Sequence, residues 1–324
     1  MFRTIVLRVA ICCCIVLSFT ALIILAQNLA IAAFFPHLAR TTTDFSPAYL
    51  RRELQALAAE RPEAIFLGDS VLWGYRLRPD QTAVQMLATR GCTCRNLSLK
   101  SGNPANEYLL TRLLLDAGAR PKVVVIEVNQ AVLNWGDPYY QTLHPAIGAL
   151  AQNSLTPFER AELSIPGAPT GIAASLDRAL DSLSLLYAMR SDIRETLYGD
   201  VPPPLHQRPR PEFFAGTYNL ARLDERNVGV HFLEKTADLL RDARVPLIAV
   251  LTPTNHALLH TYIDNPLYEA NTAYLRRLFA SRGARVLDLD SAFAADQFFD
   301  NVHLTQSGQS RLASALAAAL PPDF

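Results

Sequence analysis

Two short segments near opposite ends of the chain carry residue types that could together perform nucleophilic chemistry. The first is an apolar run, residues 64–67, that leads into a Gly-Asp-Ser turn at 68–70, and the second places Asp300 shortly before His303. A serine hydroxyl becomes a nucleophile when a histidine takes its proton and a carboxylate orients that histidine. Ser70, His303 and Asp300 therefore predict covalent acyl chemistry.

The Gly-Asp-Ser turn also has a simpler interpretation. Its glycine allows a tight turn, and Ser70 at the start of a helix would lie beside free backbone N–H groups, which favour the charge that develops during attack on an ester. The alternative is that Asp69 or Ser70 only caps the helix. His303 favours catalysis, because Thr305 or Ser307 would cap the final helix and leave the histidine in a loop at the strand ends.

The elements that must position these residues alternate along the chain. Short continuous apolar runs followed by amphipathic stretches indicate an α/β fold, with a mostly parallel sheet covered by helices on both faces. In such a sheet, ligands bind beyond the carboxyl ends of the strands. We predict strands over 65–67, 96–99, 123–128, 247–251 and 286–289, and helices over 81–89, 104–117, 228–243, 268–281 and 305–320.

Residues 131–224 interrupt this alternation. The stretch is rich in proline and contains the aromatic residues Trp135, Tyr139 and Tyr140. A connection of this length is usually a functional lid or a small subdomain. We predict one or two helices over 173–197, and an aromatic wall on which a sugar could stack.

The N-terminal forty residues do not belong to this pattern. Arg3 and Arg8 precede a run without charge over 9–26, long enough for a transmembrane helix. The positive-inside bias then places the body, residues 41–324, outside the cytoplasm, on the periplasmic or extracellular face. The alternative is a cleaved signal peptide, because Ala30-Ile31-Ala32 resembles a cleavage site with small residues at its first and third positions. Either interpretation predicts an exported body.

Composition excludes several classes of function. Half of the 324 residues are apolar, and 30 basic residues balance 30 acidic ones, so the sequence predicts a buried core and no nucleic-acid partner. Three of the five cysteines lie in the apolar segment, whereas Cys92 and Cys94 lie in the exported body, where a bridge between them is possible. No Cys/His spacing is typical of zinc, so we predict no metal and no cofactor.

The two reactive segments resemble the first and last blocks of the SGNH (GDSL) hydrolase family. The matching residues are 67–70 and 300–308, and two intermediate blocks match at Gly102 and Asn129. The resemblance covers about residues 60–324, without the insertion. It implies a three-layer, flavodoxin-like fold with Ser70 as nucleophile, His303 as base and Asp300 as its orienter. It also implies an oxyanion hole formed by the backbone N–H groups of Ser70 and Gly102 and by the side chain of Asn129.

The third block departs from the family pattern. It usually reads Gly-x-Asn-Asp, whereas residues 127–130 read Glu-Val-Asn-Gln. The oxyanion amide at Asn129 is kept. This departure, together with the N-terminal segment, is more similar to the membrane-anchored branch that modifies cell envelopes. That branch includes proteins that assist alginate O-acetylation and teichoic-acid D-alanylation.

Three functions follow as hypotheses. The first is a serine esterase or O-acyl (acetyl) transferase that acts on an envelope polysaccharide through an acyl-Ser70 intermediate, with an acylated glycan or small acyl ester as substrate and a membrane-bound acyl donor as partner. The second is an inactive scaffold that binds glycan or such a donor. The third, a secreted lipase, is disfavoured by the anchor. His144 and His256 are weaker candidates for substrate contacts.

Overall fold

The computed structural model describes residues 2–34, 47–134, 138–165, 175–176, 179–180, 183–188 and 210–321. Its centre is one sheet of five parallel strands in the order β2-β1-β3-β4-β5. The strands are β1 (Ala64–Leu67), β2 (Cys94–Asn96), β3 (Val123–Val128), β4 (Leu247–Leu251) and β5 (Arg285–Asp288). This order is the flavodoxin-like one, in which the chain changes direction between β1 and β3 and leaves a crevice at that point. The predicted α/β fold with a parallel sheet is confirmed.

The three central strands are buried on both faces, and their side chains alternate between two cores. Ile65, Leu67 and Ile126 belong to one core, whereas Phe66 and Val125 belong to the other. Successive strand residues point to opposite faces, so a strand covered on both sides must be apolar throughout. The continuous apolar runs in the sequence have this origin.

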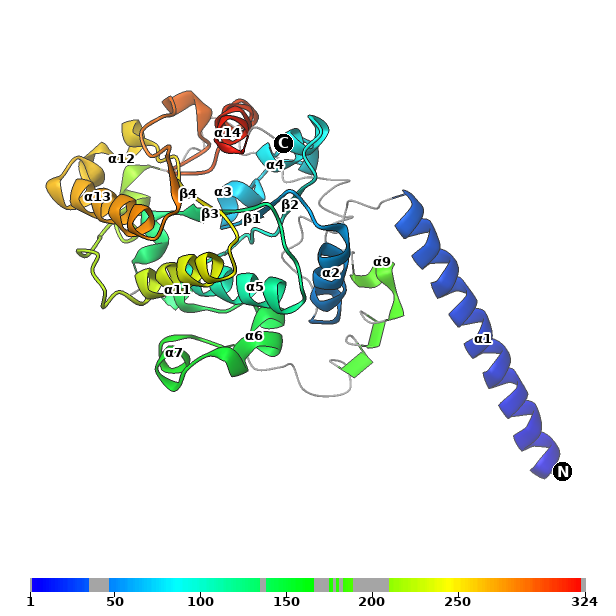
Figure 1. Cartoon of the computed structure of the whole chain (residues 1–324). Helices are drawn as coiled ribbons and strands as arrows, with labels where there is room; N and C mark the ends of the chain where they lie inside the picture. Colours follow the sequence, from blue (N-terminus) through cyan, green and yellow to red (C-terminus); the bar gives the residue numbers. More distant parts are fainter. Residues whose placement is uncertain are drawn as a thin grey trace.

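Helices cover both faces and make three layers (Figure 1). One face carries α2 (Pro47–Glu60), α5 (Pro104–Asp116), α11 (Val228–Asp242) and α13 (Pro266–Ser281), and the other carries α3 (Ser70–Trp73), α4 (Ala83–Thr89) and α14 (Gln306–Ala319). The shorter α12 (His256–Ile263) follows β4. Asparagine or threonine side chains cap α4, α5, α11, α12, α13 and α14. These caps satisfy N–H groups that each helix leaves free at its first turn.

The predicted elements agree with the observed ones except in three places. Strand 96–99 was placed too late, because the Asn96 side chain accepts a hydrogen bond from the Ser98 N–H (3.0 Å) and the regular strand ends there. The helices α2, α12, α6 (Pro145–Ala151) and α7 (Pro157–Glu162) were not predicted. Only the short α9 (Leu185–Ala188) and a few neighbouring residues of the helices expected over 173–197 are among the described residues.

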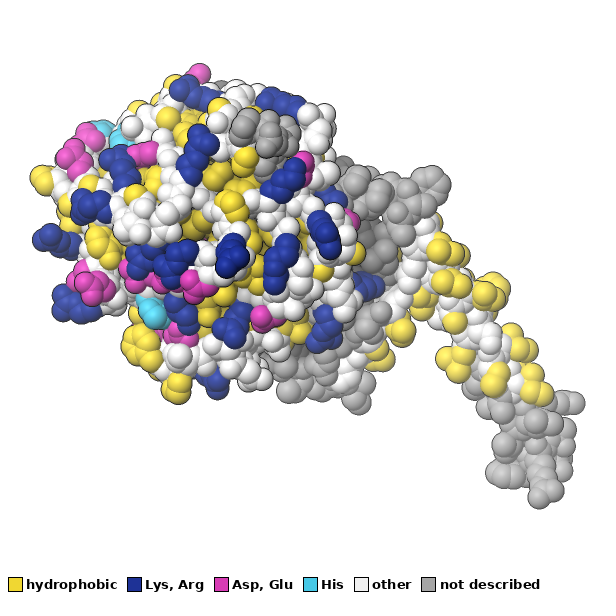
Figure 2. Space-filling view, in the orientation of Figure 1, with side chains coloured by type: hydrophobic (Ala, Val, Ile, Leu, Met, Phe, Trp, Pro, Cys, Tyr) yellow, Lys and Arg dark blue, Asp and Glu magenta, His cyan; other side chains and the backbone are white. Residues whose placement is uncertain are grey.

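The N-terminal segment is one helix, α1 (Phe2–Phe34), which extends away from the body (Figure 1). Figure 2 shows apolar side chains along its described part, and many of them are well exposed: Ile11, Ile15, Val16, Leu17, Phe19, Leu22, Ile23, Leu25 and Leu29. Within the described residues, no helix is both long enough and apolar enough to cross a membrane. The membrane anchor stays a prediction.

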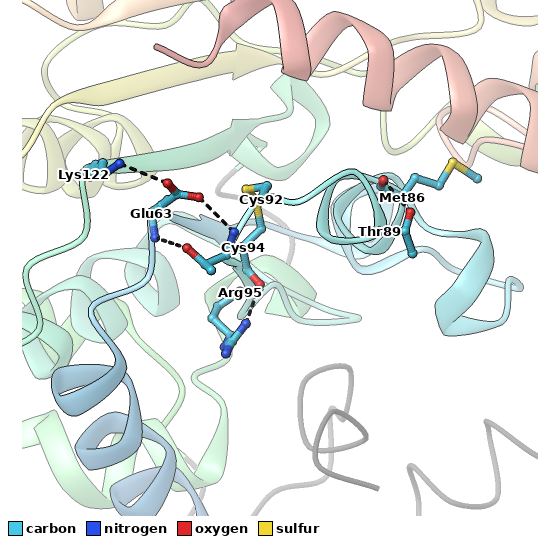
Figure 3. The surroundings of a disulfide bond; sticks show 8 residues. Glu63, Met86, Thr89, Cys92, Cys94, Arg95 and Lys122 are labelled. Atoms are coloured by element: carbon cyan, nitrogen blue, oxygen red, sulfur yellow. Dashed lines mark hydrogen bonds and ion pairs between the residues drawn. A yellow bond between two sulfur atoms is a disulfide. The ribbon is translucent and has the colours of Figure 1, made fainter. Parts of the chain in front are cut away.

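A disulfide joins Cys92 to Cys94, the first residue of the edge strand β2 (Figure 3). Between them, the Thr93 N–H donates to the Glu63 carboxylate (3.0 Å), which also pairs with Lys122 (3.0 Å). The hydrogen bond from Thr93, followed by that from Lys122, lowers the pKa of Glu63. This group of residues fixes the amino ends of β1, β2 and β3, at the edge of the sheet opposite to the reactive residues.

The described parts of the insertion pack onto the body in two places. α6 (Pro145–Ala151) and α7 (Pro157–Glu162) follow β3, and α6 contributes to the core beneath α2 and α5. The returning segment, with Phe214 and Tyr218, forms a small core with Leu259 and Ile263 of α12. The first part of the insertion therefore packs on the face that carries α2 and α5, and its last part packs on α12. Trp135 lies outside the described residues.

Candidate active site

The nucleophile turn follows β1 without an intervening loop. Asp69 caps α3 by accepting the Val71 N–H at its Oδ1 (3.0 Å), and Ser70 is the first residue of that helix. A Cβ at Gly68 would lie 2.5 Å from the Cβ of Glu127, so only glycine fits there. α3 has four residues, too few for the substantial helix dipole that the sequence interpretation invoked. Asp69, and not Ser70, therefore caps this helix, and a catalytic role for Ser70 stays a prediction.

The structure joins Ser70, His303 and Asp300 in one chain of hydrogen bonds. The Ser70 Oγ lies 2.8 Å from the His303 Nε2, and the His303 Nδ1 lies 2.7 Å from the Asp300 Oδ2. The other carboxylate oxygen accepts the backbone N–H of His303 (2.9 Å). The Asp300 carboxylate thus accepts hydrogen bonds from both the loop backbone and the imidazole ring, and it fixes the position of each. This is the geometry of a serine–histidine–aspartate triad.

Asp300 stays ionised although it is largely buried. Burial raises its pKa, but the hydrogen bond and charge of His303, together with two backbone N–H bonds, lower the pKa below its usual value. An ionised carboxylate holds a proton on the facing Nδ1 and leaves Nε2 free to accept one from serine. The Tyr75 ring packs against the His303 imidazole, with the ring centroids 4.4 Å apart.

The loop that carries Asp300 and His303 is held from outside the triad. Asn255, at the start of α12, donates its side-chain amide to the Asp300 carbonyl (2.9 Å) and its N–H to the Asn301 carbonyl (2.8 Å). The amide of Asn301 lies 3.3 Å from the buried Tyr218 hydroxyl, which comes from the insertion. Sequence reasoning missed these contacts, because they join segments that are far apart in the chain.

Asn129 follows β3 and reaches the nucleophile turn. Its Nδ2 donates to the Asp69 Oδ2 (3.1 Å), and its Oδ1 accepts the Ala131 N–H (3.0 Å). An amide nitrogen carries two hydrogens, so the second stays available for an oxyanion. Asp69 therefore orients the predicted oxyanion donor while it caps the nucleophile helix.

Gly102 lies against the same turn. A Cβ there would lie 2.2 Å from the carbonyl oxygen of Gly68, so the close approach of the two loops requires glycine. Its N–H donates to the Leu99 carbonyl (3.1 Å) within a tight turn. The structure thus brings Gly102 to the site but gives its N–H another partner, and its role as an oxyanion donor stays a prediction.

Glu127 packs against the nucleophile turn and accepts hydrogen bonds from its backbone. From the sequence, this residue was noted only as a departure from the family pattern. The side chain is 4% exposed, and its Oε2 accepts the N–H groups of Asp69 (3.1 Å) and Leu72 (3.0 Å). Burial, followed by the charge of Asp69, raises the pKa of Glu127 well above its usual value. A lone glutamate inside the β-branched strand 123–128 was the signal that could have identified it.

A cavity of about 500 Å³ opens above the triad. Its aromatic wall includes Tyr75, Tyr140, Phe213 and Phe214, three of which come from the insertion. Phe213 is 78% exposed, so its ring is available to a ligand. The cavity is lined by Asp69, Ser70, Tyr75, Arg76, Lys100, Ser101, Gly102, Asn129, Ala131, Val132, Tyr140, Phe213, Phe214, Thr217, Asp300, Asn301, Val302 and His303.

The two weaker histidine candidates have other partners. His144 caps α6 by accepting the Ala146 N–H (3.2 Å), and His256 pairs with Asp290 (3.0 Å). Neither lines the cavity. In the part of the chain that the structure describes, no group of three or more His, Cys, Asp or Glu residues is arranged to hold a metal ion.

Comparisons with known proteins give distant likenesses. A sequence model of a protein family matches residues 225–323, which is less than half of the chain. No curated protein matches the chain by sequence. A lipolytic protein of the G-D-S-L family from Veillonella parvula aligns at 10% identity and a TM-score of 0.41, over 79% of this chain and 96% of that one. A GDSL-like lipase from Bacteroides thetaiotaomicron aligns at 9% identity and a TM-score of 0.44, over 86% and 100%.

Proposed function

We propose that the chain is a serine-dependent acyl-ester hydrolase or O-acyltransferase of the SGNH type. One observation carries this proposal, namely the unbroken chain of hydrogen bonds from Ser70 through His303 to Asp300 at the floor of an accessible cavity. A scaffold without activity has no need for a serine hydroxyl that faces the free nitrogen of an oriented imidazole.

In the proposed first half-reaction, the Ser70 Oγ attacks the carbonyl carbon of an ester while the His303 Nε2 takes the hydroxyl proton. The negative charge moves to the carbonyl oxygen, where the Ser70 N–H and the Asn129 amide can donate hydrogen bonds. The carbon–oxygen bond of the leaving alcohol then breaks, and that oxygen receives the proton from His303. The product is an acyl-Ser70 ester and a free alcohol.

In the second half-reaction, the acyl group leaves Ser70. Water or a sugar hydroxyl attacks the acyl carbon, His303 takes the proton of the attacking group, and the Ser70 oxygen receives that proton when its bond to the acyl group breaks. Water yields a free acid, whereas a hydroxyl yields a new ester. The triad serves both outcomes equally, so the acceptor in the cavity decides between hydrolase and transferase.

We propose a polysaccharide of the cell envelope as the substrate, with a membrane-bound acyl donor as a partner in the transferase case. The exposed ring of Phe213, which lines the cavity together with Tyr140, supports this proposal, because aromatic faces stack on sugars. We also propose that α1 brings the chain to a membrane and that the body is exported. The exposed apolar side chains of α1 and the arginines at its start support this.

A fluorophosphonate probe tests the nucleophile. The full chain, purified in detergent, should be labelled on Ser70, as located by mass spectrometry of the modified peptide. Ser70→Ala and His303→Ala should both lose the label. Ser101 lines the same cavity and serves as the internal control. Label on Ser101 instead, or no label on a folded protein, contradicts the proposal and favours the scaffold.

A second measurement separates hydrolase from transferase. An acetyl ester is offered with and without a soluble oligosaccharide, and the released acetate and acetylated sugar are both quantified. A transferase forms acetylated sugar in excess over acetate, whereas a hydrolase releases acetate at a rate that the sugar leaves unchanged. Protease protection in intact and opened cells, together with the mass of the mature N-terminus, tests export and distinguishes an anchor from a cleaved signal.

A further inference from the structure

Charge is distributed unevenly around the cavity. Its charged lining residues, apart from the imidazole, are Asp69, Asp300, Arg76 and Lys100. Both carboxylates are committed to hydrogen bonds, Asp69 to the Val71 N–H and Asn129 and Asp300 to His303 and its loop. Arg76 and Lys100 have no carboxylate within ion-pair distance among the described residues. Two cations at a cavity mouth are therefore left uncompensated.

These two cations are held in place by aromatic rings. The Lys100 Nζ lies 5.6 Å from the ring centroids of both Trp73 and Tyr75, and the Arg76 guanidinium carbon lies 5.1 Å from the Tyr75 centroid. Contacts of a cation with a ring face at this distance are attractive and restrict the long side chains. Because the Tyr75 ring also packs on His303, both cations are fixed beside the reactive group.

The backbone at Arg76 has an uncommon conformation. Its φ is +66°, in the left-handed region that residues with a Cβ rarely adopt. The turn is fixed by the Tyr75 N–H to the Ser70 carbonyl (2.9 Å) and by the Leu77 N–H to the Gly74 carbonyl (3.0 Å). Such conformations persist where the surrounding structure enforces them, and they gather at binding sites. Here the turn sets Arg76 at the mouth directly after the nucleophile helix.

We propose that Arg76 and Lys100 form an anion-binding mouth, and that the substrate is an ester whose sugar part carries a carboxylate or phosphate group. A guanidinium presents a planar fork of donors that matches both anions, and an ammonium adds a compact point charge. This inference names the substrate class of the proposed reaction and rests on that reaction, but anion binding can be measured without turnover.

Three substrates of the same size test the proposal with the full chain: a mono-O-acetylated methyl glucoside, the corresponding glucuronide and the corresponding sugar phosphate. The charged esters should be turned over with a kcat/KM roughly tenfold or more above that of the neutral ester, and this advantage should shrink as salt is added. The glucuronide and the phosphate distinguish the two sources of negative charge.

Variants test the named residues through the ratio of kcat/KM for charged and neutral esters. Lys100→Gln and Arg76→Gln should each lower this ratio by about fivefold, the range of partly solvated ion pairs. Arg244→Gln is the matched control. Arg244 is exposed, also has a positive φ (+57°), and lies ahead of β4, at the other edge of the sheet. Its ratio should equal that of the unaltered chain.

The outcomes separate this inference from the proposed function. Equal turnover of neutral and charged esters overturns the anion-binding mouth and leaves the esterase intact. If no ester is turned over, calorimetry with the Ser70→Ala protein decides. Binding of the glucuronide or the sugar phosphate, weakened by Lys100→Gln but not by Arg244→Gln, supports the mouth without the reaction. Absence of selective binding overturns the inference.

Discussion

Two of the carboxylate–histidine pairs among the described residues, Asp300–His303 and Asp290–His256, have their carboxylates in the segment that follows β5, and the first of these two pairs belongs to the candidate site. Asp300 holds His303 at 2.7 Å, and Asp290 holds His256 at 3.0 Å. The free nitrogen of His303 faces the Ser70 hydroxyl inside a cavity. The second pair is completed by Tyr268, whose buried hydroxyl donates to Asp290 (2.5 Å).

The two pairs differ in where the neighbouring hydroxyl group lies, not in the imidazole. Burial, followed by the charge of Asp290, raises the pKa of Tyr268, so this phenol keeps its proton and donates it to the carboxylate. Ser70 instead stands on the imidazole side, where its proton can be accepted. A carboxylate–imidazole pair therefore becomes catalytic machinery only when a nucleophile and space for a substrate meet its free nitrogen.

The largest expected effect comes from removing the two hydroxyls. Ser70→Ala should lower ester turnover by at least about 10³-fold without lowering the melting temperature, because the nucleophile is lost and little packing changes. Tyr268→Phe should lower the melting temperature and leave ester turnover nearly unchanged. It removes the donor to a buried carboxylate oxygen, which costs about 1–3 kcal/mol of stability. Initial rates and thermal melts of both variants check this contrast. If Ser70→Ala and Tyr268→Phe lost activity equally, the distinction between a catalytic and a structural pair would be refuted.

The two carboxylates give the next contrast. Asp300→Asn should lower kcat by roughly 10²–10⁴-fold, because an amide no longer selects the imidazole tautomer that accepts the serine proton. Asp290→Asn should leave kcat close to that of the unaltered chain, because Asp290 does not hold the histidine that faces Ser70. Steady-state kinetics of both, on folded protein, measure this. A kcat for Asp300→Asn close to that of the unaltered chain contradicts its orienting role.

A smaller effect is expected at the oxyanion side. Asn129→Ala should lower kcat by about 10²-fold while KM changes little, because the amide acts on charge that develops in the transition state. Asn265→Ala removes a helix cap of similar chemistry at α13, and should cost about 1 kcal/mol of stability without an effect on kcat. A parallel rise in KM for Asn129→Ala would instead indicate ground-state binding.

The smallest effect concerns pH and the second pair. The hydrogen bond that His256 donates to the Asp290 carboxylate raises the pKa of His256 above its ordinary value. A raised folded pKa stabilises the protein fully below the unfolded pKa of about 6.5, and this stabilisation is lost as pH rises through the folded pKa. The melting temperature of the unaltered chain should therefore fall as pH rises from about 6.5 through the folded pKa, and His256→Gln should remove part of this fall. The change in stability behind it should be well under about 1 kcal/mol, because the ring is partly solvated. Identical melting profiles for both proteins refute this linkage.

Much of the fold could be read from local pattern. Strands 123–128 and 247–251 were predicted with their observed bounds, because a strand buried on both faces must be continuously apolar. The edge strand β2 was misplaced, because its end depends on the side chain of Asn96, which bonds both to Ser98 and to the Leu72 carbonyl. The end of an edge strand is set by such contacts and leaves little trace in hydrophobicity.

By itself the sequence determined the chemical types and their local setting: a Gly-Asp-Ser turn after a buried strand, and a carboxylate close enough along the chain to orient its histidine. The tertiary structure alone decided that Ser70 and His303 meet across 233 residues. It also decided that Glu127 closes the nucleophile turn, and that Arg76 and Lys100 line the cavity with no carboxylate partner in the part of the chain that the structure describes. Local elements follow from steric preference and burial pattern, whereas meetings between distant residues depend on how the layers pack, which residue spacing does not encode.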